Sequence, residues 1–216
     1  MIPYLGDELV FPSAELTTER GIVAIGGDLS PDRLMLAYRN GIFPWYNEDD
    51  PIIWWSLDPR MVIFPEKLKV SKSMRSLLRK EAFTVTYNQN FVKVIEACSQ
   101  IYREGQSGTW ITKEMKDAYI RLNRLGYAYS VEVWEQSELV GGLYGVKVGG
   151  VFSGESMFSL KSNASKYGFI SFIQHATKEG LKLIDCQQES NHLRSLGGES
   201  ISRKQYLTLL NKYRDL

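Results

Sequence analysis

Cysteine and histidine are scarce in this sequence, with two of each among 216 residues. Cys98 and Cys186 form no Cys-x-x-Cys pair, and a disulfide scaffold needs more than two cysteines. Such sparse ligands do not form a structural zinc site, so we expect no metal. The low cysteine content is typical of a protein from a reducing cytoplasm.

Long apolar runs are missing as well. No apolar stretch approaches the ~20 residues that a membrane-spanning helix needs, and the N-terminus lacks the basic and apolar regions of a secretory signal. The net charge is only +1, which argues against nonspecific coating of nucleic acid by the whole chain. With 44% hydrophobic and 24% charged residues, the composition is that of a globular protein.

Charge is nevertheless distributed unevenly along the chain. Residues 1–59 contain three Lys/Arg and ten Asp/Glu, whereas residues 60–80 contain seven Lys/Arg and one Asp/Glu. Four cations of the second segment lie on or beside one face of a short predicted helix: Lys72, Arg75, Arg79 and Lys80. A solvated face is the usual interpretation of such a run. The near absence of compensating acids favours an anionic partner, such as a phosphate backbone.

Hydrophobic periodicity and capping residues predict the secondary structure. The predicted helices are Ser30–Gly41, Ser71–Lys80, Phe91–Ile101, Thr112–Gly126, Ala164–Glu179 and one that begins at the capping box Ser202-x-x-Gln205. The predicted strands are Met61–Phe64, Tyr127–Glu135, Leu139–Val148, Val151–Met157 and Leu181–Cys186. This order predicts an α+β fold in which helices cross a mostly antiparallel sheet.

Asp185 is the most prominent candidate for chemistry. It ends an apolar strand, where a carboxylate faces either a cleft or the protein interior. Gln187, two residues further on, is predicted to share its face, whereas Cys186 points the other way as a core residue. Two polar groups on one face of an apolar strand favour a role in holding or deprotonating an amine. The alternative is a buried carboxylate that caps a neighbouring turn or helix.

Glu155 also lies inside an apolar strand, where an acid costs free energy unless it has a partner. It is either a counter-charge for a cationic substrate or half of an ion pair with Lys166 or Arg194. Aromatic side chains could stack an unpaired base, although they are more often core residues. The tryptophans in question are Trp45, Trp54, Trp55 and Trp110.

Several short segments, taken in order, resemble the leucyl/phenylalanyl-tRNA–protein transferase family. They are Gly26–Pro31, Tyr38–Trp45, Trp54–Arg60, Gly108–Thr112, Gly154–Ser159, Asn163–Lys166 and Leu183–Gln187. The resemblance implies a cytoplasmic enzyme of the N-end rule pathway that uses no cofactor and binds no membrane. It would move Leu or Phe from aminoacyl-tRNA to proteins that begin with Arg or Lys. The implied fold is a small N-terminal domain, residues 1–60, and an acetyltransferase-like (GCN5-related) catalytic domain, residues 61–216.

The resemblance also implies roles for particular residues. Asp185 and Gln187 would orient and activate the acceptor amine, and Glu155 would lie beside them. Trp45 and Trp110 would hold the terminal adenosine of the tRNA. An apolar cup for the Leu or Phe side chain would be lined by Leu143, Phe152, Met157, Phe169, Phe172 and Ile184. The segment Gln188–His192 departs from the family's pattern, so no role is carried over there.

Three other activities remain open at this stage. The first is an acyl-CoA N-acetyltransferase, although the loop between Met157 and Ala164 lacks the Arg/Gln-x-x-Gly-x-Gly/Ala pattern that cradles acetyl-CoA. The second is a noncatalytic RNA-binding module, which the acidic residues 1–59 argue against. The third is a cell-wall aminoacyl-tRNA transferase, which would share the donor and differ in the acceptor.

The basic helix generates a prediction. Replacing Lys72, Arg75 and Arg79 together with Ala should weaken tRNA binding and flatten its salt dependence, by about one slope unit for each lost phosphate contact. The measurement is tRNA affinity against salt concentration. Turnover of a minimal aminoacyl donor without the tRNA body serves as the control and should hardly change. An unchanged salt slope would identify this face as ordinary solvated surface.

Overall fold

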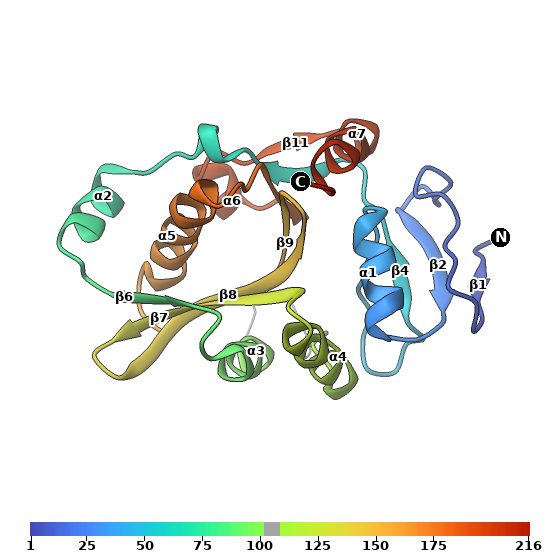
Figure 1. The fold of residues 1–216 in the computed structure, drawn as a ribbon, viewed down its shortest axis with the longest axis horizontal. Helices are drawn as coiled ribbons and strands as arrows, with labels where there is room; N and C mark the ends of the chain where they lie inside the picture. The colour runs from blue at the N-terminus through green and yellow to red at the C-terminus, as the bar shows by residue number, and fades with distance from the viewer. Residues whose placement is uncertain (102–108) are drawn as a thin grey trace.

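The computed structural model describes residues 1–101 and 109–216, in which the strands form a small and a large sheet (Figure 1). The small sheet has the order β1-β2-β4-β3. Its strands are β1 (Tyr4–Leu5), β2 (Ile22–Gly26), β3 (Phe43–Pro44) and β4 (Ile53–Trp55). Helix α1 (Pro31–Arg39) packs with it and begins as predicted, because the Ser30 side chain accepts a hydrogen bond from the Arg33 backbone N–H.

The large sheet has the order β11-β5-β10-β9-β8-β7-β6. Its strands are β5 (Arg60–Ile63), β6 (Thr84–Tyr87), β7 (Ala128–Glu135), β8 (Glu138–Val148), β9 (Val151–Ser159), β10 (Leu183–Gln187) and β11 (Glu199–Ile201). Strands β9 and β10 run parallel, whereas the other neighbouring strands of this sheet are antiparallel. The predicted α+β fold with a mostly antiparallel sheet is confirmed.

Helices cover both faces of the large sheet, and side-chain caps set several of their starts. They are α2 (Lys72–Arg79), α3 (Phe91–Gln100), α4 (Lys113–Arg124), α5 (Ala164–Lys178), α6 (Asn191–Ser195) and α7 (Arg203–Tyr213), with a 3₁₀ turn at Pro65–Lys67. The hydroxyls of Ser71, Thr112 and Ser202 accept hydrogen bonds from backbone N–H groups in the first turns. The short elements β6, β11 and α6 were not predicted, since their periodic signal is too brief.

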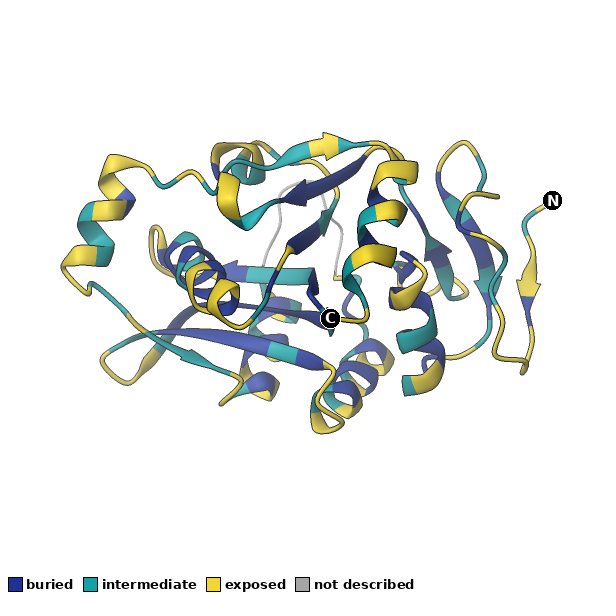
Figure 2. Cartoon of the chain, turned by 45° about the horizontal axis from the view of Figure 1, so that its top comes forward, coloured by how far each residue is buried: buried dark blue, intermediate teal, exposed yellow. Residues whose placement is uncertain are grey.

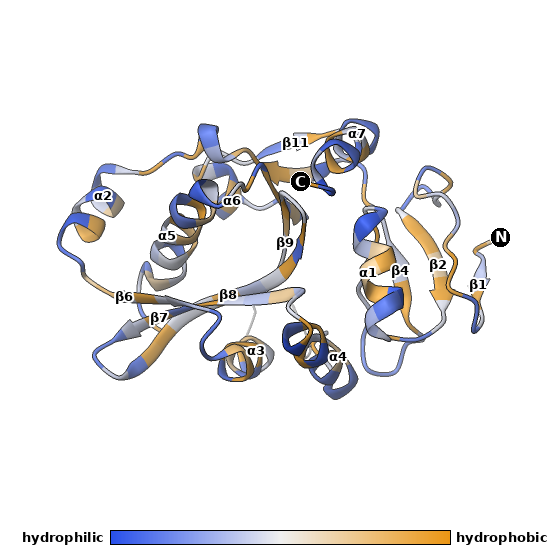
Figure 3. Ribbon diagram, viewed as in Figure 1, coloured by the Kyte–Doolittle hydropathy of each residue, from blue (hydrophilic) through white to orange (hydrophobic). Residues whose placement is uncertain are grey.

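The core lies between the large sheet and its helices (Figure 2). Alternate residues of β8 show the two faces: Leu143 packs in the cluster under α5, and Tyr144 packs in the cluster under α3 and α4. Orange segments on α3 and α4 in Figure 3 mark apolar residues of these two helices. In the described ranges, no helix has the length and apolar character that a membrane crossing requires.

The cluster under α3 and α4 continues to α1 and the small sheet, where Leu34 on α1 and Trp54 on β4 belong to the same group of buried side chains as Met115 and Tyr119. The indole N–H of Trp54 donates to the Gly26 carbonyl at 2.9 Å, which ties β4 to β2. We propose that residues 1–60 form a small domain sharing this core with residues 61–216.

The close approach of α5 to β7 generates a stability prediction. A Cβ atom added at Gly168 would lie 2.5 Å from Cγ2 of Val133, which is far too close. Gly168→Ala should therefore lower the melting temperature: overpacking costs about 1–3 kcal/mol, against a helix-propensity gain of about 1 kcal/mol. Thermal unfolding checks this, with Gln174→Ala at an exposed position of α5 as the neutral control. A melting temperature that rises for Gly168→Ala would show that the sheet yields easily here.

Candidate active site

A pocket opens where the parallel strands β9 and β10 separate. Their pairing runs from Leu183 and Val151 to Asp185 and Ser153. Beyond that point, β9 bulges against β8 and leaves Glu155 without a partner in the register. Strand β10 is irregular between Asp185 and Gln187, and Gln187 has a φ of 58°. Bulges change the direction of side chains, and here Glu155 and Gln187 are directed into a cavity of about 330 Å³.

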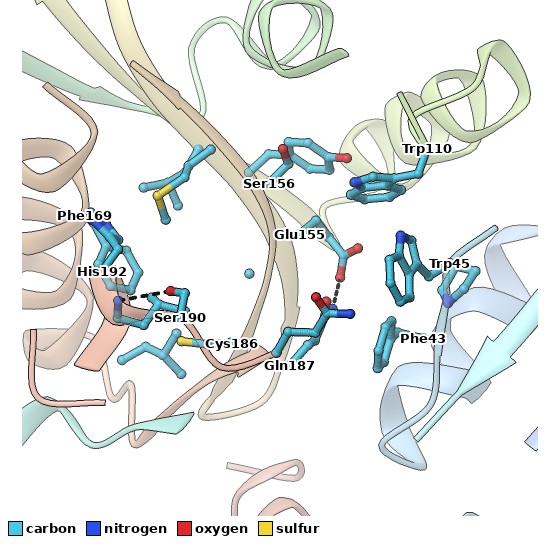
Figure 4. Close-up of a pocket in the computed structure, with 18 residues that line it drawn as sticks. Phe43, Trp45, Trp110, Glu155, Ser156, Phe169, Cys186, Gln187, Ser190 and His192 are labelled. Atoms are coloured by element: carbon cyan, nitrogen blue, oxygen red, sulfur yellow. Dashed lines mark hydrogen bonds between the residues drawn. The ribbon is translucent and has the colours of Figure 1, made fainter. Parts of the chain in front are cut away.

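The pocket has an apolar half and an aromatic half, which lie on opposite sides of Glu155 and Gln187 (Figure 4). The apolar half is formed by Leu143, Met157, Phe169, Ile184, Cys186 and Leu193. The aromatic half is formed by Phe43, Trp45 and Trp110. The indole N–H of Trp55 donates to the Trp45 carbonyl at 2.6 Å and so fixes that wall.

Glu155 is the carboxylate that lines the pocket. The Tyr119 hydroxyl donates to one of its oxygens at 3.1 Å, and the Gln187 side-chain amide donates to the other at 2.8 Å. Tyr119 is in turn hydrogen-bonded to the hydroxyl of Tyr38, on α1 of the small domain. Burial raises the pKa of Glu155 to about 7, although the hydrogen bonds oppose this shift. A group with this pKa exchanges its proton near neutral pH.

The alternative of an ion pair between Glu155 and Lys166 or Arg194 is wrong. Arg194 pairs with Glu189 at 2.7 Å, and no ion pair joins Glu155 to either cation in the described part of the chain. Position explains this result, because the bulge in β9 directs Glu155 to Tyr119 and Gln187, at the centre of the pocket.

Asp185 does not face the pocket, so the expectation of a carboxylate at a cleft is wrong. It is 0% exposed, and both of its oxygens bind the Arg60 guanidinium, at 2.8 and 2.7 Å. The hydroxyls of Tyr206 and Ser153 also donate to it, at 2.9 and 3.3 Å. Strand alternation gives the reason: Ile184 and Cys186 point to the pocket, so Asp185 between them points toward α7.

Two related expectations about β10 are also corrected. Cys186 was expected to face away, yet it lines the pocket. Gln187 does not share the face of Asp185, because its left-handed backbone conformation breaks the alternation and lets its side chain reach Glu155. Burial raises the pKa of the Cys186 thiol, and the nearby Asp185 carboxylate adds to the shift. The thiol therefore stays protonated and is a poor nucleophile.

The structure places most of the other predicted residues at the pocket. Leu143, Met157, Phe169 and Ile184 line it as expected, together with Trp45 and Trp110. Phe152 and Phe172 are absent from the lining, because they pack against each other in the core behind it, with ring centroids 4.5 Å apart. The basic residues Lys72, Arg75, Arg79 and Lys80 are exposed on and beside α2, at the end of the molecule opposite the small sheet (Figure 1), and none of them lines the pocket. Gly108 lies outside the described residues.

Several residues at or near the pocket were not predicted from the sequence. Apart from Cys186, the additional lining residues are Phe43, Pro44, Tyr144, Gly154, Ser156, Gln188, Ser190, His192 and Leu193. Phe43 and Pro44 directly precede Trp45 in a segment that carries the family resemblance, which was an available signal. Arg60 ends another such segment, Trp54–Arg60, although its pairing with Asp185 joins residues 125 positions apart. Tyr119 had no such signal, because the carboxylate that it contacts is 36 positions away.

The residues of this pocket fall within regions shared with known proteins. The family described as leucyl/phenylalanyl-tRNA protein transferase matches residues 62–211, and its N-terminal domain family matches residues 27–58. The chain belongs to the leucyl/phenylalanyl-tRNA–protein transferase family. A curated relative of that name from Christiangramia forsetii is 57% identical over 209 residues, covering 96% of this chain and 99% of the relative. Another, from Flavobacterium johnsoniae, is 55% identical over 207 residues, covering 96% and 98%.

Membership of the leucyl/phenylalanyl-tRNA–protein transferase family confirms the resemblance seen in the sequence. The protein is an enzyme that transfers an amino acid from aminoacyl-tRNA to protein, an activity that feeds N-end rule degradation. The three alternative activities are thereby set aside. Similar solved structures include a GCN5-related N-acetyltransferase from Kribbella flavida, with 12% identity, a TM-score of 0.41, and coverage of 78% of this chain and 60% of that one.

The protonated thiol in the pocket of this transferase generates a prediction. Cys186→Ala should keep most of the transfer activity and lose about 1–2 kcal/mol of stability through the small cavity. Single-turnover transfer and thermal unfolding of the same sample check both parts. A folded Cys186→Ala protein that is inactive, together with an acyl-thioester trapped on the wild type, would instead assign a covalent step to this cysteine.

Proposed function

We propose that this enzyme transfers Leu or Phe from aminoacyl-tRNA to the α-amine of proteins whose first residue is Arg or Lys, at the centre of the described pocket. One observation carries the proposal: Glu155 and Gln187 lie between an apolar half and an aromatic half. The acylated end of a tRNA has three groups in the same order: an amino-acid side chain, an ester and an adenosine. The side chain would occupy the apolar half and the adenosine the aromatic half. The ester would then lie beside Glu155.

The apolar half suits an unbranched or aromatic side chain. Its wall includes Leu143, Met157, Phe169 and Ile184, and a shape mismatch in such a cup costs about 1–3 kcal/mol per misplaced group. The aromatic half suits the adenine, since stacking on an aromatic ring contributes about 1–3 kcal/mol per base. Trp45 and Trp110 supply those rings.

The chemistry requires positioning and one proton transfer. The aminoacyl ester is already activated, so the acceptor nitrogen attacks its carbonyl carbon, the new C–N bond forms, and the bond to the ribose oxygen breaks. The nitrogen loses a proton and the ribose oxygen gains one, which leaves an amide and a free tRNA hydroxyl. Glu155 is the group we assign to this proton transfer, because it lines the pocket and its pKa of about 7 matches neutral conditions.

Gln187 and Asp185 take different parts in this proposal. Gln187 orients the reactants and Glu155, to which its side-chain amide donates a hydrogen bond. Asp185 acts from behind the strand as an orienting anion, since its oxygens are fully occupied by Arg60, Tyr206 and Ser153. It accepts the Gln187 backbone N–H at 3.0 Å and thereby influences the pocket indirectly.

The tRNA body would approach across the basic surface of α2. The exposed cations Lys72, Arg75, Arg79 and Lys80 on and beside α2 offer a surface for tRNA phosphates. We place the reaction in the cytoplasm, where charged tRNA and newly exposed protein N-termini are both available.

The role of Glu155 predicts a pH profile. The group must be ionised to accept a proton, so the single-turnover rate should rise as pH increases through about 7. A second rise, from deprotonation of the acceptor α-amine at about pH 7.7–8.0, is common to all variants. Glu155→Gln should lower the rate by about 10²–10⁴-fold and remove the rise near pH 7 alone. The measurement is transfer at saturating aminoacyl-tRNA between pH 5 and pH 9.

A matched control separates this effect from a general loss of negative charge. Glu138→Gln changes an exposed glutamate on β8 and should leave both the rate and its pH dependence unaltered. A Glu155→Gln protein that keeps the wild-type rise through pH 7 would show that another group takes the proton.

A further inference from the structure

Arg60 is a buried cation behind the pocket to which the proposed reaction assigns no role. It opens β5, is 1% exposed, and donates to both oxygens of Asp185 through Nε and Nη2. Burial disfavours the charged guanidinium, but the Asp185 carboxylate outweighs it and raises the pKa of Arg60. The side chain is therefore a permanent cation, held in a bidentate ion pair with Asp185.

Two aromatic rings enclose this ion pair. The Arg60 guanidinium carbon lies 4.7 Å from the ring centroid of Phe43 and 4.5 Å from that of Tyr206. Phe43 lines the aromatic half of the pocket, whereas Tyr206 is on α7 and also donates its hydroxyl to Asp185. Nη1 of Arg60 has no hydrogen-bond partner among the described residues, so Asp185 supplies the hydrogen bonds that hold the guanidinium.

The ion pair connects to the pocket through the backbone of Gln187. Oδ1 of Asp185 binds both Nε of Arg60 and the backbone N–H of Gln187, at 2.8 and 3.0 Å. Gln187 has a φ of 58°, a conformation that costs a non-glycine residue free energy and needs support from its surroundings. This conformation directs the Gln187 amide to Glu155, 2.8 Å away.

We infer that Arg60 is a positioning residue for transfer: by fixing the Asp185 carboxylate, it holds Gln187 in the backbone conformation that aims its amide at Glu155. The inference rests on the proposed roles of Gln187 and Glu155. It requires the planar fork of arginine, because the single ammonium of lysine does not hold two carboxylate oxygens in a fixed orientation. Arg60 itself is not among the residues that line the pocket.

The test is the kinetics of Arg60→Lys, which keeps the charge and removes the fork. Misplacement of a reacting group by about 1 Å lowers rates by about 10²-fold, so kcat should fall by about that factor. The KM for aminoacyl-tRNA should hardly change, because the cup and the tryptophans remain. Rates are measured below the melting temperature of each protein, so that unfolded protein does not contribute. A wild-type kcat for folded Arg60→Lys would overturn the inference.

A matched control is available in the small domain. Arg33 is 0% exposed, donates to Asp28 at 3.2 Å and lies outside the pocket lining. Arg33→Lys disturbs a comparably buried guanidinium, so it should lower the melting temperature and leave the kcat of the folded enzyme intact. A kcat loss equal to that of Arg60→Lys would contradict a specific positioning role, since general loosening would then suffice.

A double variant distinguishes positioning from folding. Arg60→Met combined with Asp185→Leu removes both charges, and replacing a buried ion pair by apolar residues often restores stability. Positioning predicts a recovered melting temperature with kcat still low. A purely structural pair predicts that both recover, which would refute the inference.

The transfer rate of Gln187→Ala distinguishes a failure of this inference from a failure of the proposed function. If Gln187→Ala transfers at the wild-type rate, the proposed role of Gln187 fails and the inference fails with it. If Gln187→Ala is slow and Arg60→Lys is not, the inference alone fails.

Discussion

The separation of two parallel strands is the constraint on which the rest of this structure depends. Paired strands leave no room for a substrate, because neighbouring backbones lie about 4.7–4.9 Å apart. Here the pairing of β9 with β10 ends at Ser153 and Asp185, and each strand then departs from regular geometry. The bulge at Glu155 and the left-handed Gln187 place two polar side chains at the opening. Apolar walls on one side and indole rings on the other then define what fits there.

Both the small and the large sheet contribute side chains to the site. The small sheet supplies Trp45 through the β3–β4 region, and α1 supplies Tyr38 to the hydrogen-bond chain that reaches Glu155. The large sheet supplies the carboxylate and the apolar cup. The pocket therefore forms only when the two sheets are packed together, and the shared cluster containing Trp54 and Tyr119 holds them in that arrangement.

Much of the fold could be predicted from local signals, whereas the orientation of the site could not. Caps such as Ser71 and Thr112 and the apolar periodicity located the longer helices and strands within a few residues. The alternation of side chains along β10 correctly predicted that Asp185 and Cys186 point to opposite faces of the sheet. It could not predict which of the two faces lines the pocket. The positive φ of Gln187 leaves no trace in its residue type, since glycine is the usual occupant. The pairing of Arg60 with Asp185 joins residues 125 positions apart, beyond the reach of any local pattern.

The shared core also bears on how substrates come and go. Closely packed interiors resist sliding, and the buried cluster that runs from α1 and β4 into α4 and β8 crosses the junction of the two sheets without a break. A hinge motion between the sheets would have to separate these packed side chains and expose the aromatic ones to water. We therefore expect the enzyme to work as a rigid frame. Substrates and products would then enter and leave the pocket without a hinge motion between the two sheets.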